Sequence, residues 1–191
     1  FQSQRSDKYA AAIEKLIREG RAYPDSTPPG ELEAQRKAAE AAKRPFVFRG
    51  DQRDMDPVRA LEIYQAAKPS VRFKVPTGRT TVLEDKVRGR IEWQTDLLGD
   101  FTIARTDGKP LYNLASVVDD VDMQITHIVR AEEHLSNTHP QILLFEALGS
   151  PAPVFAHIPY VAAPGTKKKL SKRNPPPGVM VALEEYERAG Y

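Results

Sequence analysis

The sequence contains no cysteine among its 191 residues. Disulfide bonds, thiolate catalysis and cysteine-containing zinc sites are therefore excluded. No apolar run approaches the ~18 residues that a membrane-spanning helix needs. The polar start, residues 1–7, does not resemble a signal peptide. We expect a cytoplasmic protein with no membrane partner.

An excess of one charge is also lacking, because 28 Lys and Arg residues are balanced by 26 Asp and Glu residues. The net charge of +2 is too small to indicate nucleic-acid binding by itself, so local charge must decide that question. A composition of 40% hydrophobic and 28% charged residues is typical of a folded globular protein. The chain starts at Phe1 and stops just after Ala189-Gly190, where a helix has been capped, so we expect a segment of a longer protein.

Periodicity predicts helices in the first part of the chain. Residues 7–20 carry apolar residues at helical spacing, with Asp7 as N-cap and Gly20 as the stop. A Pro-rich connection, residues 23–29, precedes a mostly solvated helix at 31–44. Pro57 suits the first turn of a third helix at 57–67.

Strand-like segments follow. Four segments are rich in β-branched and aromatic residues and are separated by Gly, Pro and Asp turns. They indicate one small antiparallel sheet and comprise residues 71–75, 81–84, 89–93 and 101–105. Residues 125–131, 133–148 and 154–161 then alternate strand, helix, strand, which predicts a parallel βαβ unit. A last helix is predicted at Val179 to Ala189.

The loop Gly165 to Arg173, GTKKKLSKR, is the most informative segment chemically, since it places five cations within seven residues. Such a loop suits a polyphosphate or nucleic-acid contact, and a solvated basic loop is an equal alternative from charge alone. It lacks the glycine spacing of a Walker A loop. The four histidines form no metal-ligand pattern and are interpreted as structural or surface residues: His127, His134, His139 and His157. Asp119, Asp120 and Asp122 are interpreted as a solvated helix end.

Within that loop, Lys169 to Arg173 (KLSKR) resembles the KMSKS signature of class I aminoacyl-tRNA synthetases in its glutamyl variant. The segments DFTIARTDGKPLYNLASVVDD, ITHIVRAEEHLSNTHPQILLFEALG and FAHIP precede it in the order and spacing of glutamyl-tRNA synthetases. FKVP and VRGRIEW are similar to that family's acceptor-stem-binding insertion. The resemblance covers nearly the whole chain.

The resemblance implies an α/β fold: the second half of a Rossmann-type nucleotide-binding fold plus a small α+β acceptor-stem-binding insertion. The implied division is a core helix at 1–22, the insertion at 23–99, the second half of the catalytic core at 100–164, and the KMSKS-like loop with its following helix at 165–191. The implied enzyme is a glutamate-tRNA ligase, which joins L-glutamate to tRNA(Glu) with ATP and its Mg²⁺. We expect a monomeric full-length enzyme without zinc, because many relatives bind zinc through cysteines that this insertion lacks.

The resemblance also assigns roles to individual residues. Lys172, helped by Lys169, would stabilise the charge on the leaving pyrophosphate, and Ser171 and Glu133 would contact ATP. Arg130 would hold the side-chain carboxylate of glutamate, with an ion pair to a neighbouring Glu as the alternative. Glu133 could equally complement a helix dipole. Tyr112 and Ser116 would line the glutamate pocket. The candidates for acceptor-stem phosphates are Arg72, Lys74, Arg79, Lys86, Arg88 and Arg90.

The sequence also departs from the family. The H-x-G-H type motif, the amino-terminal glutamate-binding arginine and the anticodon-binding domains are absent, so the chain alone is expected to be inactive. The run 174–178, NPPPG, departs from the short link expected before the last helix. Three rivals stay open: a glutaminyl-tRNA synthetase, a glutamyl-queuosine tRNA(Asp) synthetase and a non-catalytic acceptor-stem-binding module.

Overall fold

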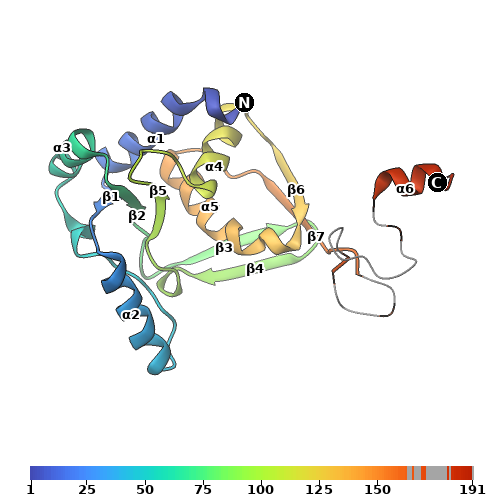
Figure 1. The fold of residues 1–191 in the computed structure, drawn as a ribbon, viewed down its shortest axis with the longest axis horizontal. Coiled ribbons are helices and arrows are strands. Elements are labelled where there is room, and N and C mark those ends of the chain that lie inside the picture. The colour runs from blue at the N-terminus through green and yellow to red at the C-terminus, as the bar shows by residue number, and fades with distance from the viewer. Residues whose placement is uncertain (163–164, 166–168, 171–179, 181, 191) are drawn as a thin grey trace.

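The computed structural model describes residues 1–162, 165, 169–170, 180 and 182–190 (Figure 1). Helix α1 (Ser6–Arg18) buries Tyr9, Ile13 and Leu16 on one face. Its N-cap is Arg5 rather than the predicted Asp7, which lies in the first turn and complements the helix dipole there. Helix α3 (Pro57–Ala67) matches its predicted bounds.

The predicted single antiparallel sheet was wrong, because its strands divide between two sheets. Strands β1 (Ala22–Asp25), β2 (Ser70–Phe73) and β5 (Phe101–Ala104) form one antiparallel sheet in the order β1-β2-β5. Strands β3 (Thr80–Asp85) and β4 (Gly89–Gln94) form a separate hairpin. Local sequence specifies extended backbone, whereas the partner of each strand depends on long-range packing.

Strand β1 lies in the segment predicted as a Pro-rich connection. All four of its residues are buried, and Pro24 is tolerated because β1 is an edge strand. The burial of Tyr23 in the shared interior outweighs the turn signal of the neighbouring prolines.

The parallel βαβ unit is confirmed. Strand β6 (His127–Ala131) pairs in parallel with β7 (Val154–Ile158), and helix α5 (Leu135–Leu148) connects them. A short 3-10 helix, η4 (Glu132–His134), precedes α5, and Gly149 ends it with a positive φ of 76°. In the described part of the chain β6 pairs with β7 alone, and the Val129 side chain is 68% exposed.

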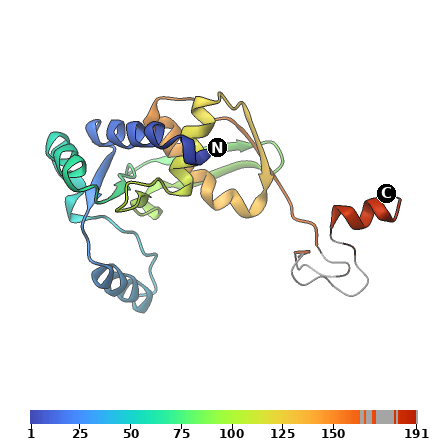
Figure 2. The same cartoon turned by 45° about the horizontal axis from the view of Figure 1, so that its top comes forward.

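The remaining helices differ in how they pack. Helix α4 (Tyr112–Asp122) packs against α5. Helix α2 (Pro29–Ala41) projects from the body in Figures 1 and 2, and Ala39 is its one buried residue. Helix α6 (Leu183–Arg188) is shorter than predicted, and Val179 lies outside the described residues. Short 3-10 helices also occur at η1 (Gln2–Gln4), η2 (Asp51–Asp54) and η3 (Thr95–Leu97). None of the helices that the structure describes is long and apolar enough to cross a membrane.

One continuous core joins these elements. It takes side chains such as Ile13, Phe73, Ile103, Leu114 and Phe145 from α1, β2, β5, α4 and α5. Residues on both sides of the predicted division between 99 and 100 contribute to this core.

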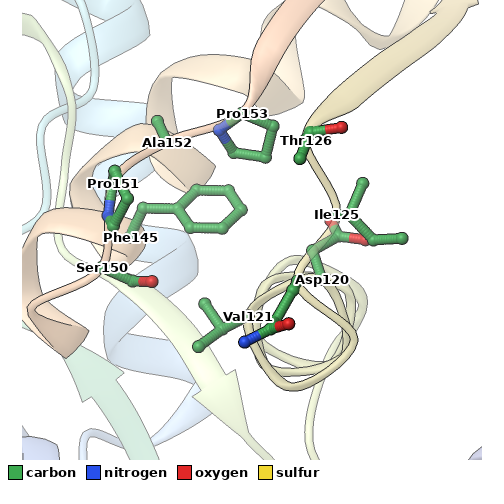
Figure 3. Close-up of a pocket in the computed structure, with 10 residues that line it drawn as sticks. Asp120, Val121, Ile125, Thr126, Phe145, Ser150, Pro151, Ala152 and Pro153 are labelled. Atoms are coloured by element: carbon green, nitrogen blue, oxygen red, sulfur yellow. The ribbon is translucent and has the colours of Figure 1, made fainter.

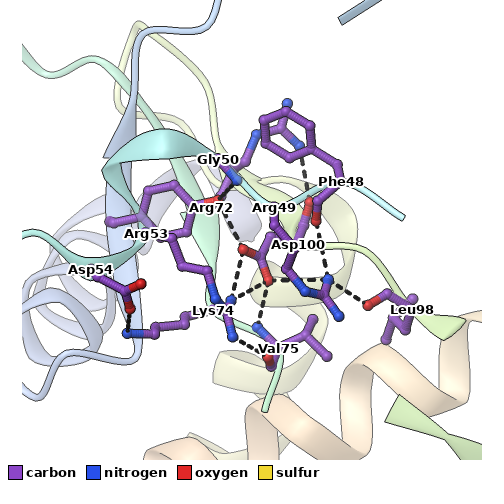
Figure 4. Close-up of polar contacts among 11 residues, drawn as sticks. Phe48, Arg49, Gly50, Arg53, Asp54, Arg72, Lys74, Val75, Leu98 and Asp100 are labelled. Carbon is purple, nitrogen blue, oxygen red and sulfur yellow. Dashed lines mark hydrogen bonds and ion pairs between the residues drawn. The ribbon is translucent and has the colours of Figure 1, made fainter. Parts of the chain in front are cut away.

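A fully buried carboxylate, Asp100, ties the segment before β5 to three other parts of the chain (Figure 4). It accepts hydrogen bonds from Arg53 Nη1 at 2.7 and 2.8 Å, from the Tyr23 hydroxyl at 2.9 Å and from the Val75 N–H at 2.9 Å. The preceding residue, Gly99, must lack a side chain because the Phe48 backbone passes close to it. A Cβ on Gly99 would lie 2.7 Å from the Phe48 backbone nitrogen.

Candidate active site

Four of the described candidates for contacts to glutamate and ATP gather at the carboxyl ends of the parallel strands β6 and β7: Arg130, Tyr112, Glu133 and Lys169. Arg130 lies near the end of β6 and Glu133 in η4 directly after it. Tyr112, at the start of α4, is within hydrogen-bonding reach of the Arg130 guanidinium. Open α/β folds bind their ligands at this edge.

Neutral groups surround the Arg130 guanidinium. Its Nε donates to His157 Nε2 at 3.1 Å, and its Nη2 donates to Thr138 Oγ1 at 2.7 Å and to Gln141 Oε1 at 2.8 Å. The guanidinium also lies 5.4 Å from the centre of the Phe155 ring. Among the described residues, Arg130 does not form the alternative ion pair with a neighbouring Glu. Burial lowers the pKa of Arg130, and the Tyr112 and Asp120 side chains act in the opposite direction. The side chain is thus a half-buried cation without a carboxylate partner among the described residues.

Tyr112 and Ser116 lie one helical turn apart on α4. The Tyr112 side chain remains 53% exposed, and its ring centroid is 6.3 Å from that of His134. Ser116 hydrogen-bonds to Asp120. Burial, followed by the nearby charge of Asp119, raises the pKa of Asp120. Tyr112 therefore faces the guanidinium, while Ser116 is committed to its own helix.

Lys169 and Glu133 form an ion pair, which joins two residues predicted to contact ATP. Their side chains are 52% and 49% exposed. Lys169 is brought back beside the chain leaving β7 because it pairs with Ala162, and the Leu170 N–H donates to the Val161 carbonyl at 2.8 Å. The hydrogen bond from Lys169 lowers the pKa of Glu133. Ser171 and Lys172 lie outside the described residues.

Sequence reasoning missed the groups that surround Arg130. His157 is fully buried in β7, and its Nδ1 lies 2.6 Å from Asp85 Oδ2 at the end of β3. Burial alone raises the pKa of Asp85, but hydrogen bonds from the Arg88 N–H, the His157 ring and the Val87 N–H lower it to about 2. The sequence did offer a signal for His157, because side chains alternate between the two faces of a strand. This alternation places His157 on the same face of β7 as the buried Phe155.

Five of the six candidate tRNA contacts pair with acidic side chains, and these five differ in exposure. Arg72 is 11% exposed and pairs with Asp25. Lys74 pairs with Asp54 at 2.7 Å, and Arg79 with Glu146 at 2.5 Å. Arg88 pairs with Glu132, and Arg90 pairs with Glu84 and Glu92. Arg90 is the most open of these side chains, at 59% exposed.

Other polar groups build structure. Asp119 and Asp122 are not a solvated end, because Arg5 contacts them at 2.6 and 2.7 Å and ties α4 to α1. The described residues include no group of three or more His, Asp or Glu side chains that could hold a metal ion.

A hollow of about 480 Å³ lies at the amino ends of β6 and β7, where Asp120, Ile125, Phe145 and Pro153 line it (Figure 3). It is at the opposite end of the parallel strands from Arg130, so it is not the site described above.

Comparisons with known proteins identify the family to which this fold belongs. The family model for "tRNA synthetases class I (E and Q), catalytic domain" matches residues 1–191. The chain is 46% identical to glutamate–tRNA ligase 1 of Caldanaerobacter subterraneus subsp. tengcongensis, covering 100% of this chain and 39% of that protein. It is 43% identical to the glutamate–tRNA ligase of Aquifex aeolicus, again over 100% of this chain and 39% of that protein.

Solved structures agree as well. The crystal structure of a glutamate tRNA ligase from Elizabethkingia meningosepticum, in complex with its amino acid, has a TM-score of 0.77 and 34% identity, over 90% of this chain and 36% of that chain. The expected α/β, Rossmann-type fold is confirmed. This chain therefore belongs to the class I tRNA synthetases of the glutamate and glutamine type, as part of their catalytic domain.

Proposed function

We propose that this chain is part of a glutamate-tRNA ligase. The enzyme activates L-glutamate with ATP to glutamyl-adenylate and pyrophosphate, then transfers the glutamyl group to the 3′ end of tRNA(Glu). The chain spans 39% of the length of the curated relatives described above, so the complete reaction belongs to a longer protein. Such an enzyme is expected to act in the cytoplasm as a monomer.

The observation that carries this proposal is the state of Arg130. A half-buried guanidinium held by neutral side chains, at the carboxyl end of a parallel strand, retains its full charge for a ligand. Arginine binds carboxylates well because its hydrogen bonds to them are charge-assisted, and the Nη1 group is not used by these three bonds. The side-chain carboxylate of glutamate is the ligand that we assign to it. Tyr112 would line the same pocket, with Ser116 further along α4.

ATP, bound as its Mg²⁺ complex, is the second substrate. Glu133 would accept hydrogen bonds from the ribose hydroxyls, and Lys169, with Ser171, would contact the phosphates. In-line attack at the α-phosphate builds negative charge on the leaving pyrophosphate. Lys172 would stabilise that charge, so ATP binding would replace the Lys169–Glu133 ion pair with contacts to substrate.

The tRNA acceptor stem would lie along the basic side chains of the hairpin and its neighbours. The exposed fractions favour Arg90, Arg88 and Arg79 over the enclosed Arg72. Lys74, whose side chain is 30% exposed, is intermediate.

Glutamate-dependent ATP–pyrophosphate exchange in the full-length protein, with tRNA present, tests the assignment. Lys172→Ala should reduce turnover by about 10²-fold, the scale of removing one preorganised charge-stabilising contact. Lys167→Ala, in the same basic loop, is the matched control and should leave turnover within about twofold. Equal and small effects of both substitutions would reduce the loop to a general basic surface and favour the non-catalytic RNA-binding alternative.

A further inference from the structure

Arg130 is oriented by side chains from two different elements. Thr138 and Gln141, at 0% and 1% exposure, come from α5, while His157, also at 0%, comes from β7. The two α5 side chains accept hydrogen bonds from Arg130 Nη2, and His157 accepts one from Arg130 Nε. A guanidinium held at both positions cannot rotate without breaking one of these bonds.

His157 can accept a hydrogen bond from Arg130 only if its Nε2 carries no hydrogen. Asp85 fixes the hydrogen on the other ring nitrogen, Nδ1, and the Arg130 N–H directed at Nε2 leaves Nε2 as the acceptor. Its ionised carboxylate can only accept, and it lies 2.6 Å from His157 Nδ1, so the ring hydrogen is on Nδ1. The Nε2 lone pair then faces Arg130 Nε at 3.1 Å, and Thr138 Oγ1 lies 2.9 Å from the same nitrogen.

Asp85 is itself held rigidly, because it ends β3 and closes the turn of the β3–β4 hairpin. It accepts from the N–H groups of Val87 at 3.0 Å and Arg88 at 2.9 Å. The next residue, Lys86, donates its N–H to the Phe155 carbonyl of β7 at 2.9 Å. Asp85 also accepts from the His157 N–H at 3.1 Å. The hairpin turn is thus bonded to the strand that carries His157.

We infer that His157, oriented by Asp85, is a positioning residue that sets the direction in which Arg130 presents its remaining N–H groups to the substrate carboxylate. The hairpin turn, far from Arg130 in sequence, thereby controls the affinity for the amino acid. This inference rests on the proposed function, since it assigns a partner to the residue that binds glutamate.

Two substitutions in the full-length protein separate the two ring nitrogens. His157→Asn retains a donor near Asp85 but removes the acceptor at the Nε2 position. His157→Gln can place its carbonyl oxygen near that position and so restore the acceptor. Because a hydrogen bond to a charged group is involved, we expect His157→Asn to raise the KM for glutamate about 10- to 100-fold. The KM for ATP should stay within about twofold, and His157→Gln should recover part of the loss.

His139→Asn is the matched control, because His139 is also a buried histidine, at 5% exposure, and stacks on Trp93 instead of contacting Arg130. It should lower thermal stability without changing the KM for glutamate. Pyrophosphate exchange is measured for all variants with glutamate and ATP varied in turn.

The outcomes distinguish this inference from the proposed function. If the unmodified protein shows no glutamate-dependent exchange, both fail. If it is active and His157→Asn behaves like His139→Asn, the positioning role alone is refuted. A parallel rise in the KM for both substrates would also refute it, since that result indicates general loss of structure.

Discussion

Replacing Asp100 with Ala should destabilise the fold more than any surface substitution. The substitution leaves the buried Val75 N–H and Tyr23 hydroxyl without their acceptor, and it strips Arg53, whose side chain is 14% exposed, of its carboxylate. Breaking a buried ion pair from one side costs about 3–5 kcal/mol. Each orphaned buried donor would add roughly 1–3 kcal/mol if the losses were independent. They share one oxygen pair and are not independent, so we expect a total near 5 kcal/mol.

The assay is urea unfolding of the 191-residue chain, followed by the fluorescence of its single tryptophan, Trp93. When the same fluorescence is followed on heating, a loss near 5 kcal/mol corresponds to a Tm lower by about 10–20 °C for a chain of this size. Asp54→Ala is the control, because Asp54 pairs with Lys74 on the surface and is 84% exposed. It should not shift the midpoint measurably. A loss below about 1 kcal/mol for Asp100→Ala would show that water replaces the lost contacts and that the cluster is not a structural hub.

Two further predictions concern the hairpin turn and the approach to β5. The native pKa of Asp85, about 2, lies below the ~3.9 of a free aspartate. Its contribution to stability is therefore complete above about pH 4 and is lost as the pH falls towards 2, so urea midpoints of Asp85→Asn should lack that acid-side decline. If the urea midpoint of Asp85→Asn fell at low pH as steeply as that of the unmodified chain, this prediction would be wrong. Gly99→Ala should also destabilise the fold, since the new Cβ would meet the Phe48 backbone at 2.7 Å, and a Tm equal to that of the unmodified chain would show that this segment shifts freely.

The sequence predicted the elements better than it predicted their partners. Helical periodicity and the Pro57 signal located α3, and alternation of strand and helix located the parallel β6–β7 unit. Pairing of β2 with β1 and β5, rather than with the hairpin, depends on which faces become buried together. No local pattern in the sequence specifies these strand partners. Tyr23 is a second example, because its burial favours a strand where the neighbouring prolines indicate a loop.

The candidate site shows the same division between local and long-range information. Arg130, Tyr112 and Glu133 could be proposed because motif context marks them, and their roles remain predictions that the experiments above test. Asp85 could not be found in this way, since its bond to His157 crosses 72 positions of the chain. Its neighbours VLED and KVRG indicate an ordinary hairpin turn, and only the docking of that turn on β7 shows what the carboxylate contacts.

Among the residues that the structure describes, the outer edge of β6 is unpaired and offers a place where another strand can join. Backbone N–H and C=O groups along an unpaired edge act as a template for strand addition. Pro24 has no N–H to offer along β1, whereas residues 127–131 of β6 include no proline, and exposed Val129 lies among them. Edge-to-edge association of two copies and completion of the sheet by another stretch of a longer chain would therefore compete for the same backbone groups.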